Sequence, residues 1–131
     1  MFPRHFTVEE ATEYLPWLRR KFETLVFLYN EITKSQETIN ELNLMMRSNG
    51  TSLEEKLTEK YGHTPELTKS LQESLDEVVR EEIIVRDIEA GLVDFPFLRD
   101  GEEVFLCWTL AEDQISYWHP TNQGYSSRQS L

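Results

Sequence analysis

The sequence has little cysteine, little glycine and no long hydrophobic run, and each shortage excludes a class of protein. Cys107 is the only cysteine among 131 residues, so the chain cannot close a disulfide of its own. The longest apolar run, residues 25–29, is far shorter than the roughly 20 residues that cross a membrane, and the N-terminus lacks the apolar segment of a signal peptide. No Gly-rich phosphate loop, nucleophile elbow or dinucleotide fingerprint occurs. We therefore expect a cytoplasmic protein with no cofactor.

Positive charge is scarce as well. Thirteen lysines and arginines stand against 24 acidic residues, which gives a net charge of −11. Nucleic acids and anionic membranes are bound through lysine and arginine, so we expect neither as a partner. Residues 87–131 carry eight acidic and two basic side chains and are the more acidic part per residue. A basic protein partner would fit this charge, although plain solubility explains it equally well.

The first 82 residues are rich in helix-forming and charged side chains. Thr7 and Glu10 form a capping box, which predicts a first helix from Val8 to about Leu15. Pro16 suits the first position of a new helix, so we expect a bend there and a second, long helix over residues 17–47.

The long helix repeats apolar residues at alternating steps of four and three, as in a coiled-coil seam. Gln36 and Asn43 interrupt the seam, either because they fix register in a dimer or because the helix is exposed there. The nine seam positions are Leu18, Phe22, Leu25, Tyr29, Ile32, Gln36, Ile39, Asn43 and Met46. After a stop at Ser48–Thr51, capping signals predict a short helix over residues 52–60 and another over 64–82. The helices together predict a long antiparallel helical hairpin.

From Ile83 the apolar residues alternate with a period of two, which predicts strands. We expect an antiparallel β-meander of three to four strands over residues 83–119, packed on the helices, and a polar tail over 120–131. The chain as a whole is predicted to be a single α+β domain, residues 1–131.

Asp100-Gly101 is a two-residue hairpin signal that pairs Arg99 with Glu102 and, further back, Asp94 with Cys107. A four-residue loop at the next turn would pair Cys107 with Trp118. Three further residues, Phe95, Leu106 and Trp108, then lie with His119 on the buried face. Asp94, Cys107, Thr109, Ser116 and Trp118 lie on the other face. This register separates cysteine from histidine and argues against a Cys-His nucleophile pair.

Few side chains are suited to chemistry, and no catalytic residue is predicted. Asp94, Cys107 and His119 are metal-ligand types, but they lack any recognised ligand spacing, so no metal site is predicted. Asp94 lies between apolar neighbours and needs partners if it is buried. A structural role, accepting backbone hydrogen bonds near Pro96, is the simplest explanation.

Two blocks of residues resemble a known family. The first is Phe6–Ala11 followed by Leu15–Arg19. The second comprises Arg86-Asp87, Gly91–Pro96, Gly101, Val104, Leu106–Trp108, Glu112, Ile115, Tyr117–His119, Gly124 and Arg128. Together they resemble the small bacterial and archaeal proteins catalogued as domain of unknown function 2203. The family tends to have lysine at Arg86, glycine at Ala111 and an acidic residue at Pro120. The resemblance implies no activity, but it singles out Asp87, Asp94, Glu112, His119 and Arg128 as candidate ligand-binding residues.

Two functions are open at this point. The first is an interaction or structural module that forms a homodimer through its long helix. The second is a small-ligand or metal-binding site on the sheet, with a possible enzymatic role. It would use Asp94, Cys107, Glu112 and His119, and it requires at least three of them to converge.

Overall fold

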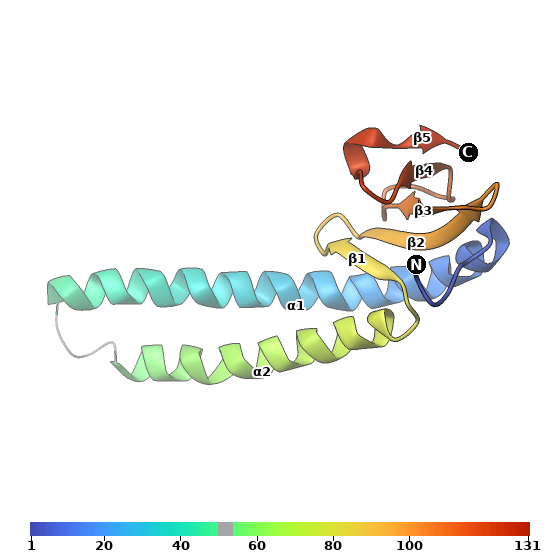
Figure 1. Ribbon diagram of the computed structural model, residues 1–131. Coiled ribbons are helices and arrows are strands. Elements are labelled where there is room, and N and C mark those ends of the chain that lie inside the picture. Colours follow the sequence, from blue (N-terminus) through green and yellow to red (C-terminus); the bar gives the residue numbers. More distant parts are fainter. Residues whose placement is uncertain (50–53) are drawn as a thin grey trace.

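The structure, a computed structural model, describes residues 1–49 and 54–131. The side chains of residues 38–39, 42–43 and 45–64 are left out of the description. Helices α1 (Val8–Asn49) and α2 (Glu54–Val79) lie side by side, and a sheet covers the N-terminal half of α1 (Figure 1). The predicted α+β class is confirmed. Because residues 50–53 are not described, the predicted hairpin turn stays a prediction.

Helix α1 begins at the predicted capping box. The Glu10 backbone N–H donates to Thr7 Oγ1 (3.0 Å), and the Thr7 N–H donates to Glu10 Oε1 (3.1 Å). The predicted division at Pro16 is wrong, since one helix runs from Val8 to Asn49 with Pro16 inside it. A proline costs the helix one hydrogen bond. Leu15 and Leu18 are buried on either side of Pro16 and hold both turns against the core.

The first half of the predicted seam forms the core face of α1. Leu18, Phe22 and Leu25 are fully buried. Tyr29 and Ile32 are half-buried, and Gln36 is exposed. The last three seam positions, Ile39, Asn43 and Met46, lie outside the described side chains, so the seam beyond Gln36 stays a prediction.

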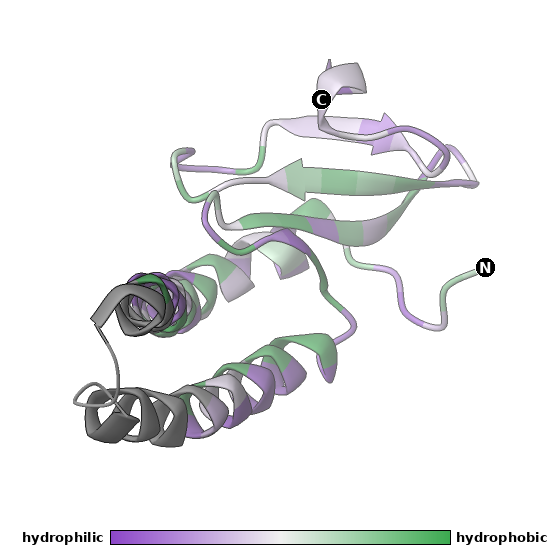
Figure 2. Cartoon of the chain, turned by 90° about the vertical axis from the view of Figure 1, so that its left-hand side faces the viewer, coloured by the Kyte–Doolittle hydropathy of each residue, from purple (hydrophilic) through white to green (hydrophobic). Residues whose placement is uncertain are grey.

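The second helical part is one helix rather than two. Helix α2 is continuous over Glu54–Val79 and contains Pro65, where we expected a new helix to start. It ends three residues before the predicted Glu82. The predicted stop at Ser48–Thr51 and the cap at Ser52 fall partly on residues outside the description. Hydrophobic residues gather on the side of α2 that is turned toward the sheet (Figure 2).

The described residues form a five-stranded antiparallel sheet in the order β1-β2-β3-β4-β5. The strands are β1 (Ile84–Asp87), β2 (Leu92–Arg99), β3 (Glu102–Trp108), β4 (Tyr117–Pro120) and β5 (Gln129–Ser130). We predicted three or four, and the fifth lies in the segment predicted as a tail. A 3-10 turn, η2 (Tyr125–Ser127), precedes it.

The β2–β3 hairpin has the predicted register. Asp94 pairs with Cys107 and Arg99 with Glu102. Asp100 (φ 52°) and Gly101 (φ 81°) both have positive φ, as the tight hairpin turn requires. The inner face of the hairpin packs in the hydrophobic core together with Phe6 and Phe22. Figure 2 shows that the middle strands of the sheet are hydrophobic.

The predicted β3–β4 register is wrong by one residue. Cys107 pairs with Tyr117, and Phe105 pairs with His119. We had placed the turn in four residues between Leu110 and Ile115, but the whole of residues 109–116 lies between the two strands. Trp118, predicted on the outer face, packs against the core. Because side chains alternate along a strand, the shift moves His119 to the face that carries Cys107.

Candidate functional site

Three neighbouring strands bring an aspartate, a cysteine and a histidine together on the outer face of the sheet. Asp94 comes from β2, Cys107 from β3 and His119 from β4, and each residue is only 1% exposed. One donor atom from each, a carboxylate oxygen, a sulfur and a ring nitrogen, lies within 4.8 Å of the other two. We call these three residues the triad. Their convergence is the condition that the second functional hypothesis set.

Asp94 is held by two side chains. Its Oδ2 accepts a hydrogen bond from Arg86 Nε (2.9 Å), and its Oδ1 lies 3.0 Å from His119 Nε2. A buried carboxylate needs such partners, because an unpaired charge in the interior is costly. The partners of Asp94 are therefore the side chains of Arg86 and His119, and not the backbone N–H groups near Pro96 that we predicted.

His119 is fixed by a backbone contact on its other nitrogen. Nδ1 lies 2.8 Å from the carbonyl oxygen of Pro120. A carbonyl only accepts hydrogen bonds, so Nδ1 carries a hydrogen and donates it. Nε2 is thereby turned toward Asp94. It either donates a proton to that carboxylate or presents its lone pair to the interior of the triad.

Cys107 is a buried thiol beside a negative charge. Burial, followed by the charge of Asp94, raises its pKa to about 12, against the opposing influence of Arg128. The thiolate is the nucleophilic form of cysteine. Although Cys107 and His119 share a face, a thiol with this pKa is not an activated nucleophile.

Two other candidates, Glu112 and Arg128, bind each other. Arg128 Nη1 donates to both carboxylate oxygens of Glu112 (2.9 Å each), and the guanidinium lies over the rings of Tyr117 and Tyr125. Glu112 Oε1 also accepts from the Thr109 backbone N–H (2.9 Å). The pair ties the turn after β3 to the C-terminal segment.

The backbone of the same turn is held from α1. Arg19 Nη2 donates to the carbonyl of Glu112 (2.8 Å), and the indole of Trp108 donates to the same carbonyl (3.0 Å). Glu112 therefore holds the turn in place, and its carboxylate does not join the three side chains of the triad.

Asp87 also lies outside the triad. Its Oδ1 accepts a hydrogen bond from the Ala90 backbone N–H (3.2 Å) in the turn after β1. Sequence reasoning gave no role to Arg86, the partner of Asp94. The family resemblance included this position, but only the pairing of β1 with β2 places it beside the carboxylate.

The triad opens onto a polar cavity of about 400 Å³. Arg86 and the segment from Thr121 to Tyr125 line it. The C-terminal segment, predicted as a tail, thus covers the triad and forms part of its access route. The three residues line this cavity, and each is only 1% exposed.

Comparisons with known proteins identify the family. The model of the family described as "Uncharacterized conserved protein (DUF2203)" matches residues 4–131. The chain belongs to this family, as the motifs in the sequence predicted. No curated protein matches the chain, and no solved structure does. Among the helices that the structure describes, none is long and apolar enough to cross a membrane.

Proposed function

We propose that this member of the DUF2203 family binds a transition-metal ion, with zinc as the best match, through Asp94, Cys107 and His119. The observation that carries the proposal is the convergence of three different donor atoms within 4.8 Å. The sequence predicted no metal site, because these residues lack any recognised ligand spacing; the proposal depends instead on their convergence across three strands.

The donor set favours zinc over the hard cations. Zinc is bound by cysteine sulfur, histidine nitrogen and carboxylate oxygen, whereas magnesium and calcium take oxygen ligands. The surroundings also fit. A histidine ligand usually donates its second N–H to a carbonyl or carboxylate, as His119 does to Pro120. Arg86 orients the Asp94 carboxylate in the same way.

The charges of the triad can balance a divalent ion. Asp94 and the thiolate of Cys107 supply two negative charges, and His119 binds as the neutral imidazole. Because the pKa of the Cys107 thiol is about 12, metal binding must displace its proton, and affinity will rise with pH. Three protein ligands would leave a four-coordinate zinc ion one position for water or substrate, as in catalytic zinc sites. The cavity of about 400 Å³ adjoins the triad.

Cobalt titration tests the proposal directly. Since Cys107 is the only cysteine, a sulfur-to-cobalt charge-transfer band in the metal-stripped protein can come from no other residue. We expect one cobalt ion per chain, displaced by zinc. A chain without this band, or one that binds no zinc in a chelator competition, would rule the site out.

Matched variants locate the ion. Cys107→Ser and His119→Gln should lower zinc affinity more than the about 10- to 100-fold that loss of an outer hydrogen-bond partner costs. Arg86→Gln should fall within that smaller range. His5→Gln, at a histidine paired with Glu103 outside the triad, should leave affinity unchanged. Far-ultraviolet circular dichroism separates lost binding from lost folding, and unchanged affinity in a folded Cys107→Ser variant refutes the assignment.

The other expectations remain proposals. They are a homodimer through the long helix, a basic protein partner, a cytoplasmic location and a single domain. The dimer is supported only by the apolar spacing of the seam beyond Leu25, because the earlier seam positions are buried in the chain's own core. Gln36, in that later part, is exposed. Light scattering tests it: a strictly monomeric protein at high concentration would contradict the dimer.

A further inference from the structure

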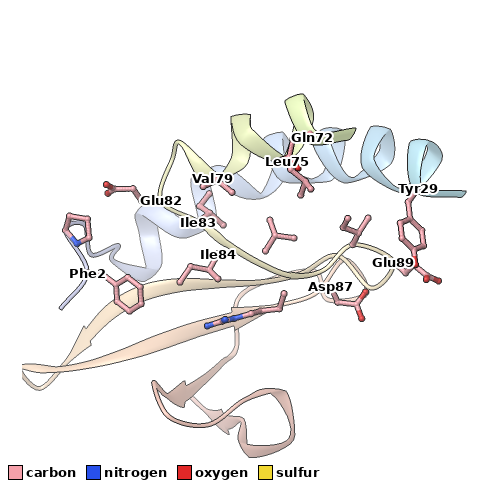
Figure 3. A pocket seen from close by; sticks show the side chains of 14 residues that line it. Phe2, Tyr29, Gln72, Leu75, Val79, Glu82, Ile83, Ile84, Asp87 and Glu89 are labelled. Carbon is pink, nitrogen blue, oxygen red and sulfur yellow. The ribbon is translucent and has the colours of Figure 1, made fainter. Parts of the chain in front are cut away.

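A second cavity lies away from the triad, between the edge strand β1 and the two helices. Its volume is about 730 Å³, and it is lined mainly by apolar side chains of α2 and the β1 region. Figure 3 shows Leu75 and Val79 of α2 on one side and Ile84 of β1 on the other. We call it the β1 groove. Its size falls in the range of small-molecule sites, about 300–1,000 Å³.

The rim of the β1 groove is acidic. Glu82 lies at one end, and Asp87 and Glu89 lie at the other (Figure 3). The ion pairs of Arg4, Lys21, Arg86 and Arg128 are all made with carboxylates other than Glu82 and Glu89. Arg86 is the one basic side chain in the described lining, and its Nε is bonded to Asp94. The groove therefore offers negative charge at both ends of an apolar floor.

The backbone of Glu82 has a left-handed conformation that is unfavourable for a residue with a side chain. Its φ is 66°, just after the last turn of α2, where glycine is the usual residue. Its backbone N–H donates to the carbonyl of Val79 (2.8 Å) and completes the helix end. A carboxylate is thus kept on the groove at a position where a residue without a side chain would fold more easily.

We propose that the β1 groove binds a small amphipathic amine, with its apolar body on the floor and its cationic end at the carboxylates. A second copy of the chain is a poor occupant, because it would have to bring basic side chains to these carboxylates, and residues 87–131 have only two. Addition of a peptide strand to β1 is also disfavoured. The strand has only four residues, and its pairing with β2 is irregular between Val85 and Asp87, as in edges that resist strand addition.

Three ligands that share one apolar body and carry a positive charge, no charge or a negative charge test the proposal. We would measure 4-phenylbutylamine, 4-phenylbutanol and 4-phenylbutyrate by calorimetry and by amide chemical shifts, in the metal-stripped protein. The amine should bind about two- to fivefold more tightly than the alcohol, which is the size expected for an exposed ion pair of up to about 1 kcal/mol. The acid should bind least, and added salt should narrow the differences. Shifts should centre on Leu75, Ile84 and Ile88.

Two variants test the contributions of the carboxylates and of the apolar floor of the groove separately. Glu82→Gln combined with Glu89→Gln should reduce the preference for the amine and leave the affinity for the alcohol unchanged. Glu102→Gln, an exposed residue of the β2–β3 hairpin, is the matched control. Val79→Ser should weaken all three ligands without unfolding the chain, because Val79 is 55% exposed.

Each alternative outcome overturns the proposal. Equal binding of amine, alcohol and acid would show apolar adhesion without charge selection. No binding, or binding unaffected by Val79→Ser, would remove the groove as the site. In a further outcome, an extended basic peptide pairs with β1 through backbone contacts and binds more tightly than the amine does. That result would identify a peptide, and not a small molecule, as the ligand of the groove.

Discussion

Replacing Glu112 by glutamine tests whether the Glu112–Arg128 pair builds the fold or belongs to the metal site. Glutamine keeps the shape of the side chain and removes its charge. Arg128 would remain between Tyr117 and Tyr125 without its partner. The carboxylate also accepts the Thr109 N–H, which the glutamine carbonyl can still do.

The magnitude follows from burial. The side chains of Arg128 and Glu112 are 13% and 19% exposed. Breaking a fully buried ion pair costs about 3–5 kcal/mol, and a hydrogen bond to a charged group contributes about 1.5–3 kcal/mol. For this partly exposed pair we expect a loss of about 2 kcal/mol. An unfolding entropy of about 0.28 kcal/mol per kelvin for 131 residues converts this to a Tm lowered by roughly 7 °C.

Thermal and urea unfolding, followed by circular dichroism, measure the loss. Arg128→Met and the double variant complete a mutant cycle, whose coupling energy isolates the pair from its separate contacts. Glu102→Gln, at an exposed carboxylate, should change stability by no more than about 0.5 kcal/mol. If Glu112→Gln leaves Tm unchanged and abolishes zinc binding, the structural role is refuted and Glu112 belongs to the site.

Two further predictions concern the hairpin turns and the N-terminal segment. Gly91 has φ +62°, and a Cβ there would lie 2.3 Å from Leu110 Cγ, so Gly91→Ala should cost about 2–4 kcal/mol in urea unfolding. Gly101 (φ +81°) has open space around it, so Gly101→Ala should cost only the left-handed conformation, about 1–2 kcal/mol; equal losses would contradict the clash. A hydrogen bond from the Phe2 N–H, and then His5, lower the pKa of Glu103 below 4.5. The stabilisation that the ionised Glu103 carboxylate gives the N-terminal segment is thus present above pH 4.5 and is lost as the pH falls through the lowered pKa. Over that pH range the Phe2 amide should lose its protection from hydrogen exchange. Glu103→Gln should remove this pH dependence.

The parts of the fold that were predicted correctly depend on local signals. The Asp100-Gly101 turn fixes the β2–β3 register, because two flanking strands with apolar residues on one face fit only one pairing. The capping box at Thr7 depends on residues three apart, and it formed as predicted. These signals act over a few residues, so the sequence displays them fully.

The errors arose where distant contacts outweigh local preference. Proline is a helix breaker in isolation, but burial of Leu15 and Leu18 keeps α1 continuous through Pro16. Strand β5 is two residues long and polar, and it forms by pairing with β4. No local pattern could reveal either result. The role of Arg86 likewise depends on β1 lying beside β2.

The triad itself was hidden by a single-residue error. Pairing Leu110 with Ile115 seemed favourable because both are apolar. Ile115 is indeed buried, but it reaches the core from the loop and not from a strand. The carbonyl of Glu112, bonded to Arg19 and to the Trp108 indole, determines the path of this loop. These long-range contacts decide which face of the sheet His119 occupies.

Inserting one glycine between Asp113 and Gln114 tests what sets this register. Both residues are exposed, and the anchors of the turn lie on either side of them. Before them are the Glu112 contacts; after them is the Ser116 carbonyl, which accepts the Leu131 N–H (2.9 Å). Lengthening the loop by one residue adds about 0.1 kcal/mol of closure entropy. A slip of β4 would instead expose Trp118 and bury His119 against apolar side chains, which costs several kcal/mol.

We therefore expect the inserted residue to bulge into solvent and the register to persist. The Tm should fall by less than about 2 °C, which corresponds to roughly 0.5 kcal/mol. Contacts between the backbones of Cys107 and Tyr117 should remain in nuclear Overhauser spectra, and zinc affinity should be unchanged. If Cys107 instead pairs with Trp118 and zinc binding is lost, loop length rather than the buried contacts sets the register. The triad would then depend on the number of residues between Trp108 and Tyr117.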